Sequence, residues 1–68
     1  MTSTQPVPLE VLQIAMTDRR ADVRWYATEA LQKCLTPEAL KLAKGMQLDT
    51  DQFVRISAND AIAMILWT

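Results

Sequence analysis

Few side chains in this 68-residue sequence could do chemistry, and they form no recognised catalytic set. The chain has no histidine, so the commonest general base and the commonest metal ligand are both missing. Its single cysteine, Cys34, lies on the apolar side of a predicted helix, and no histidine or lysine is placed to activate it. We expect a small buried side chain there. We therefore predict that the chain is not an enzyme and uses no metal or cofactor.

Four acidic residues have spacings worth comparing with known sites. Asp49 and Asp51 resemble the start of a calcium loop, but the third acid, the glycine and the closing glutamate are missing. Helix capping explains both aspartates. Glu29 and Asp60 hold equivalent positions on two predicted helices. Acid–base catalysis by such a pair needs a pocket, and two helical hairpins offer little concavity, so we expect both on a solvated face.

Arg19, Arg20 and Arg24 form the one local basic cluster. Asp18 and Asp22 flank it, and the whole chain has seven basic and eight acidic residues, a net charge of −1. Because affinity for nucleic acid rests on phosphate neutralisation, a general nucleic-acid binder is disfavoured. A nucleic-acid-associated helical domain that uses these three arginines remains the alternative function.

Apolar periodicity predicts that these side chains are carried by four helices. Apolar residues recur at helical spacing through four stretches, and neither strand alternation nor a hairpin signal occurs. The predicted fold class is therefore all-α. We expect a first helix of roughly ten residues from Leu9, a second over 21–35, a third that begins at Thr36-Pro37-Glu38 and stops at Gly45, and a fourth that opens at Asp49-Thr50-Asp51.

The two halves of the chain match when they are shifted by 31 residues. The motif Asp-x4-Val-Arg-x2-Ala-x2-Ala-Leu/Ile occurs over 18–31 and again over 49–62. The matches fall at cap and core positions, which indicates one helical hairpin present twice. Such a unit buries its apolar face by stacking on a neighbour. We predict a single domain over 1–68, with repeats at about 6–35 and 37–67.

This motif resembles the HEAT repeat, and its short period is similar to that of the HEAT-like repeats of the phycobilisome-lyase type. The resemblance covers nearly the whole chain after Gln5 and implies two stacked helical hairpins, a short α-solenoid. It also implies that Asp18 or Asp49 caps its helix and pairs with Arg24 or Arg55 across the repeat boundary. The resemblance is to the repeat unit and carries no lyase activity. The glycine usual after the second helix is missing, and two repeats are fewer than the roughly three of an independent solenoid.

The core stripes leave several apolar side chains on outer faces. Trp25 is expected to be exposed on the second helix with Tyr26 at the border, and the fourth helix carries a second apolar side. Exposed apolar surface usually marks an interface, and aromatic residues are its usual anchors. The alternative is that Phe53 and Trp67 fold over the ends of the core. The candidate partner-binding residues are Trp25, Tyr26, Phe53, Ile56, Met64 and Trp67.

The predicted function is therefore non-catalytic protein binding, as an adaptor, a small inhibitor or an accessory subunit. A domain of this size is marginally stable alone, so we expect a homo-dimer or a subunit of a larger complex. A piece of a longer solenoid is an open alternative. The sequence shows no signal-peptide pattern, and its longest apolar run, 61–67, is too short to span a bilayer. We expect a cytoplasmic protein with no membrane partner.

Overall fold

The computed structural model describes residues 7–67, and all regular structure in that range is helical. The all-α fold class is therefore confirmed for these residues, in which no strand occurs. Pro6, at the start of the predicted first repeat, lies outside the described residues, as do 1–5 and 68 of the predicted domain. The elements are α1 (Leu9–Ala15), α2 (Ala21–Ala30), the short 3-10 turn η1 (Leu31–Lys33), α3 (Pro37–Met46) and α4 (Gln52–Leu66).

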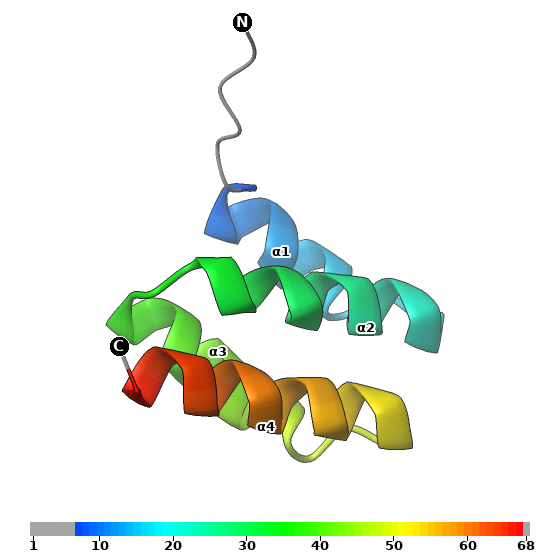
Figure 1. Cartoon of the computed structure of the whole chain (residues 1–68). Helices are drawn as coiled ribbons and strands as arrows, with labels where there is room; N and C mark the ends of the chain where they lie inside the picture. The colour runs from blue at the N-terminus through cyan, green and yellow to red at the C-terminus, as the bar shows by residue number, and fades with distance from the viewer. Residues whose placement is uncertain (1–6, 68) are drawn as a thin grey trace, which may run out of the picture.

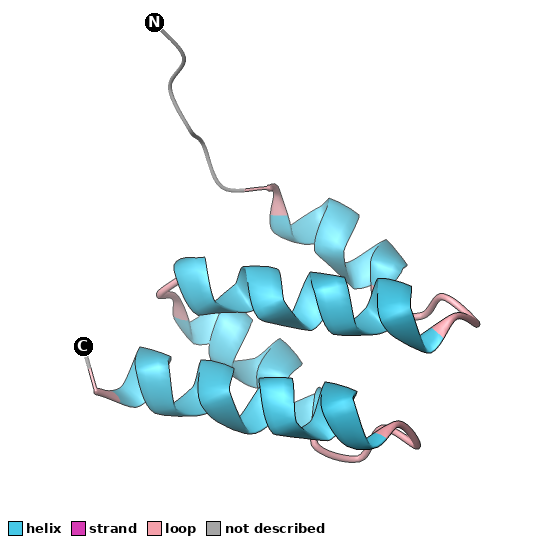
Figure 2. Cartoon of the chain, turned by 45° about the vertical axis from the view of Figure 1, so that its right-hand side comes forward, coloured by secondary structure: helices cyan, strands magenta, loops and turns pink. Residues whose placement is uncertain are grey.

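The four helices form two layers. α2 and α4 lie side by side and run in the same direction, and α1 and α3 run in the opposite direction behind them (Figure 1). The view turned by 45° shows the same two front helices with α1 and α3 behind them (Figure 2). α4 makes its most extensive contacts with α2 and α3, whereas α1 contacts chiefly α2. The front layer therefore presents one surface to which both α2 and α4 contribute.

Short-range signals explain where α3 and α4 begin. Thr36 caps α3, because its side chain accepts a hydrogen bond from the amide three residues on at 3.2 Å, and Pro37 takes the first helical position. Asp51 caps α4, because its Oδ1 accepts from the amides of Phe53 and Val54 at 2.8 and 3.1 Å. Both caps use a side chain next to the helix that it starts, which is why the sequence alone predicts them.

The predicted end of the second helix is wrong. The apolar pattern continues to Leu35, but α2 ends at Ala30 and tightens into η1. The backbone has left helical geometry by Cys34 (φ −107°, ψ 86°), and Thr36 is extended (φ −127°, ψ 159°) as an N-cap must be. The cap of α3 thus sets the end of α2, since one short connection serves both helices.

Two further boundaries differ from expectation. α1 has seven residues rather than about ten. Gly45 does not stop α3, which continues through Met46, and no glycine in 7–67 has a positive φ. The helix ends instead through tightened bonds, from the amide of Gln47 to the carbonyl of Lys44 and from the next amide to Gly45. The glycine therefore lies inside the helix without serving as a left-handed cap.

The core between the layers is small and rich in alanine. Small side chains let α2, α3 and α4 approach closely. Cys34 belongs to this core, and its Sγ donates to the carbonyl of Ala30 at 3.7 Å, so it is the small buried side chain that was expected. None of the described helices is long and apolar enough to cross a membrane. The buried apolar residues are Leu12, Met16, Ala27, Leu31, Cys34, Ala39, Ala43, Val54, Ala58 and Ala61.

Candidate protein-binding surface

All four aromatic side chains of the chain lie at the surface. Trp25 is 39% exposed and Trp67 is 87% exposed, and Tyr26 and Phe53 are also exposed. The alternative that Phe53 and Trp67 fold over the ends of the core is therefore wrong. The buried residues of α2 and α4 are all small or medium in size: Ala27, Thr28, Val54, Ser57, Ala58 and Ala61. The structure leaves a core without aromatics and a surface that contains them all.

Trp25 is the centre of this aromatic surface. It lines one open hollow with Phe53, near the start of α4, and a second with Tyr26 and Met64 farther along the front layer. α2 and α4 both contribute side chains to each hollow, and Val7 and the η1 residues Gln32 and Lys33 complete the second. An aromatic anchor flanked by hollows is typical of surfaces that bind protein side chains.

Ile56 on α4 and Trp67, the C-cap residue that follows α4, are exposed but line neither hollow. They are eleven residues apart, a spacing that places two residues on the same side of a helix. Asp60 lies between them and interrupts the apolar stripe, as the sequence predicts. We call the six candidate residues together the front apolar surface: Trp25, Tyr26, Phe53, Ile56, Met64 and Trp67.

A hydrogen bond that the sequence analysis missed joins the two front helices. Ser57 Oγ donates to Glu29 Oε2 at 2.6 Å, and Gln32 Nε2 donates to the same oxygen at 3.0 Å. Glu29 is half-buried and lines the second hollow, and its counterpart Asp60 is exposed. The available signal was a contrast in the repeat, because the small hydroxyl of Ser57 stands where the first repeat has Tyr26.

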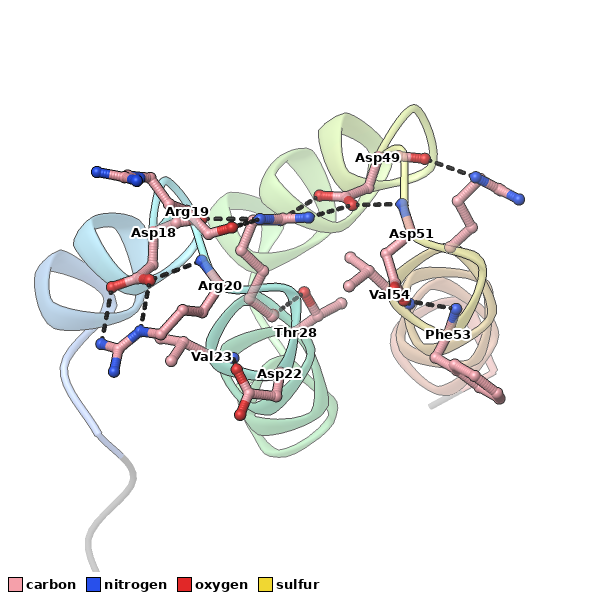
Figure 3. Close-up of polar contacts among 12 residues, drawn as sticks. Asp18, Arg19, Arg20, Asp22, Val23, Thr28, Asp49, Asp51, Phe53 and Val54 are labelled. Atoms are coloured by element: carbon pink, nitrogen blue, oxygen red, sulfur yellow. Dashed lines mark hydrogen bonds and ion pairs between the residues drawn. The ribbon is translucent and has the colours of Figure 1, made fainter.

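Arg24 joins the two halves of the chain. Its Nε and Nη2 donate to Oδ2 and Oδ1 of Asp49 at 2.8 and 3.1 Å, and its Nη1 donates to the carbonyl of Asp18 at 2.8 Å (Figure 3). The side chains of Arg24 and Asp49 are only 14% and 9% exposed. Their hydrogen bond holds the pKa of Asp49 below its usual range and raises the pKa of Arg24. Of the pairings implied by the resemblance, the structure makes this one.

The other two members of the implied set act locally. Arg20 Nε donates to Asp18 Oδ1 at 3.1 Å, so Asp18 pairs within its own turn, and this bond lowers the pKa of Asp18. Arg55 Nη1 donates to the backbone carbonyl of Asp49 at 2.8 Å. Neither Asp18 nor Asp49 caps a helix, since the N-caps are Arg20 and Asp51. Each of these aspartates instead accepts the amide two residues on, which holds the turn before the helix.

Two of the three arginines of the basic cluster, Arg20 and Arg24, form ion pairs within the chain. Arg20 is bound to Asp18, and Arg24 is bound to Asp49. Within residues 7–67, only Arg19 of the three keeps a guanidinium without a hydrogen-bond partner. The pair that Arg24 makes is almost fully buried, whereas the pair that Arg20 makes is largely exposed. No cluster of metal-ligating side chains occurs in the described range either.

The ion pair predicts how stability depends on pH. The pKa of Asp49 is lower in the folded chain than in the unfolded one, so its stabilisation is present above the unfolded pKa of about 4. That stabilisation is lost as the pH falls through the folded pKa. We expect the free energy of unfolding to fall below about pH 4, and to fall less steeply in Asp49→Asn, which has no carboxyl there. Urea unfolding of both proteins at a series of pH values measures the difference.

Asp18 titrates in both proteins and therefore serves as the common background of this comparison. If the free energy of unfolding falls equally steeply below about pH 4 in the wild type and in Asp49→Asn, the ionisation of Asp49 does not contribute to stability.

Comparisons with known proteins gave no match: no family model, no curated protein and no solved structure is significantly similar to this chain.

Proposed function

We propose that this chain is a non-catalytic protein-binding module, an adaptor, small inhibitor or accessory subunit, that acts through the front apolar surface. One observation carries the proposal: the chain places all four of its aromatic side chains at the surface and none in its core. Burying large apolar side chains is the main source of stability for so small a domain. Keeping them exposed is costly to solubility and is explained by a partner that covers them.

The architecture that we propose for this module is a pair of stacked HEAT-like hairpins, α1 with α2 and α3 with α4. The parallel course of the two front helices and the repeated turn contacts support it. In such a stack Trp25 and Ile56 occupy equivalent positions on neighbouring units, 31 residues apart. A rigid spacing between anchors lowers the ordering cost of binding. The module works in the cytoplasm, as a homo-dimer or as a subunit of a larger complex.

Replacing Ile56 with aspartate tests the proposed surface. A charge placed in a desolvated contact is left unpaired, so we expect at least about tenfold weaker binding to a protein captured by the wild type. The measurement is an affinity capture with mass spectrometry, followed by titration of the captured protein against each variant. Trp67→Ala is expected to weaken binding in the same direction, since tryptophan is a common interface anchor.

Ile14→Asp is the matched control, because Ile14 is an exposed isoleucine on α1, in the rear layer. Equal loss of binding in Ile14→Asp and Ile56→Asp would locate the contact away from the front apolar surface. A salt titration separates the alternative function: an apolar contact responds weakly to salt, and a steep loss would instead implicate the arginine cluster in nucleic-acid binding.

A further inference from the structure

The turns before α2 and α4 make the same polar contacts. Asp18 Oδ1 accepts from the amide of Arg20 at 2.9 Å, and Asp49 Oδ1 accepts from the amide of Asp51 at 2.8 Å (Figure 3). The carbonyls of these two aspartates are bound in the same way. Arg24 Nη1 donates to one at 2.8 Å, and Arg55 Nη1 donates to the other at 2.8 Å. Each turn therefore holds its own arginine in the same position.

The two arginines differ in what the rest of the guanidinium binds. Arg24 uses Nε and Nη2 to hold the carboxylate of Asp49. The same two nitrogens of Arg55 meet no acceptor among residues 7–67. A guanidinium fixed at one nitrogen, with two adjacent donors unused, matches a carboxylate in geometry and in charge. Arg55 is thus prepared for a second aspartate.

The surface around Arg55 copies one half of the internal contact. Thr28 on α2 and Leu31 at the start of η1 are fully buried in the chain. Their counterparts one repeat later are Asn59, which is exposed, and Ile62, which is half-buried. Leu66 beyond them is also exposed. The α4 end of the chain therefore carries the apolar Ile62 and Leu66 and the polar Asn59, which accepts from Gln47 Nε2 at 2.8 Å, on the same helix as Arg55.

The opposite end of the chain copies the other half. In the internal contact, α4 contributes Val54, Ser57 and Ala61, which are almost completely buried. Their counterparts on α2 are accessible: Val23 and Ala30 are half-buried and Tyr26 is exposed. With two valines, Val7 and Val11, these three line an open apolar groove between α1 and α2. Asp18, the counterpart of Asp49, is in the turn that precedes this groove.

We propose that the Arg55 end of one copy binds the Asp18 end of a second copy, head to tail, with Arg55 holding the carboxylate of Asp18 as Arg24 holds Asp49. Both halves of a contact that the chain already makes internally recur at its two ends, and their charges are complementary. In the free chain Arg20 occupies Asp18 at 3.1 and 3.3 Å. The Arg20 side chain is 72% exposed, and exposed ion pairs add little stability. Replacing Arg20 by Arg55 of another copy at Asp18 therefore costs little.

The two repeats also differ in a compatible way at the positions of the Ser57–Glu29 hydrogen bond. Internally, the short Ser57 meets the long Glu29. At the proposed contact the long Tyr26 faces Asp60, so the hydroxyl side chain is longer and the acid is shorter. Because the two surfaces that meet are different, a pair of copies still has one free end of each kind. Further copies can add there, and the product is a chain or a ring rather than a closed pair.

Charge reversal tests this contact. Sedimentation velocity on the whole chain is expected to show a mass that grows with concentration for the wild type. Arg55→Asp alone and Asp18→Arg alone are expected to remain monomeric, because each sets like charges against each other. An equimolar mixture of the two variants is expected to associate again, because each then meets the opposite charge. Arg20→Ala is expected to associate more strongly than the wild type, since it frees Asp18.

Three further measurements keep the test decisive. Lys41→Asp makes the same charge change on α3, outside both ends, and is expected to associate like the wild type. Circular dichroism verifies that each variant is helical. Ile56→Asp changes a part of the front apolar surface that lies outside the head-to-tail contact, and it is expected to associate like the wild type. Loss of self-association in Ile56→Asp would place the contact between copies on the front apolar surface and would overturn the head-to-tail proposal. A wild type that is monomeric at all concentrations, or a mixture of folded variants that does not associate, would overturn the head-to-tail contact.

Discussion

Leu31→Ala is expected to lower the free energy of unfolding by about 2–5 kcal/mol, and thereby to leave much of the protein unfolded. Leu31 is fully buried and is among the largest fully buried side chains of the chain. It begins η1, the turn that packs against α2, α3 and α4 together. A core of this size supplies only about 3–5 kcal/mol of stability, so one large cavity removes most of it.

Leu48→Ala is the matched control for this prediction. Leu48 is 87% exposed, and the same truncation there removes almost no buried surface, so its effect is expected to stay within about 0.5 kcal/mol. Thermal and urea unfolding followed by circular dichroism compare the two variants with the wild type. Equal losses would mean that the stability of this chain does not come from the packing around η1.

Asp49→Ala is expected to lower the free energy of unfolding by about 2 kcal/mol, because it removes charge-assisted hydrogen bonds and leaves a half-buried arginine without its partner. Asp49 accepts from Nε and Nη2 of Arg24 and from the amide of Asp51. Its side chain is 9% exposed, so water replaces these bonds poorly. The loss is measured by urea unfolding near neutral pH, where the carboxyl is ionised.

Asp18→Ala is the control that separates the contribution of the buried ion pair from that of the hydrogen bond within the turn. Asp18 makes the same bond to the amide two residues on, but its arginine partner, Arg20, is exposed. Its removal is expected to cost clearly less than that of Asp49. A double-mutant cycle of Arg24→Gln with Asp49→Ala then measures the pair itself. A coupling near zero, or equal losses in the two aspartate variants, would show that the cross-repeat pair contributes nothing.

The two predictions describe one design, in which stability comes from a small aliphatic core and one ion pair between the halves. The aromatic side chains take no part in that core, and all four of them lie at the surface. The same sequence motif that joins the halves is present at both ends of the chain. The head-to-tail contact that we propose would repeat between copies the contact that the chain makes once internally.

The local sequence was sufficient for the elements and for several of their ends. Apolar periodicity predicted four helices, and Thr36 and Asp51 predicted the starts of α3 and α4, because a capping side chain binds amides only two or three residues away. It failed at the end of α2, where the apolar pattern continues to Leu35 although the helix does not. Leu31 and Cys34 are buried although they lie beyond α2, because a 3-10 turn also places residues against the core, whereas Leu35 is exposed.

Only the tertiary structure decided which charges meet and which apolar residues stay exposed. In the sequence, Asp18 with Arg24 and Asp49 with Arg55 are equivalent pairs, and nothing local separates them. The position of α4 beside α2 brings Asp49 to Arg24 and leaves Arg55 without a carboxylate among residues 7–67. Helix formation depends on neighbours along the chain, whereas pairing and exposure depend on which helices pack together. That packing brings together residues that are 25 positions apart, as the bond from Arg24 to Asp49 shows.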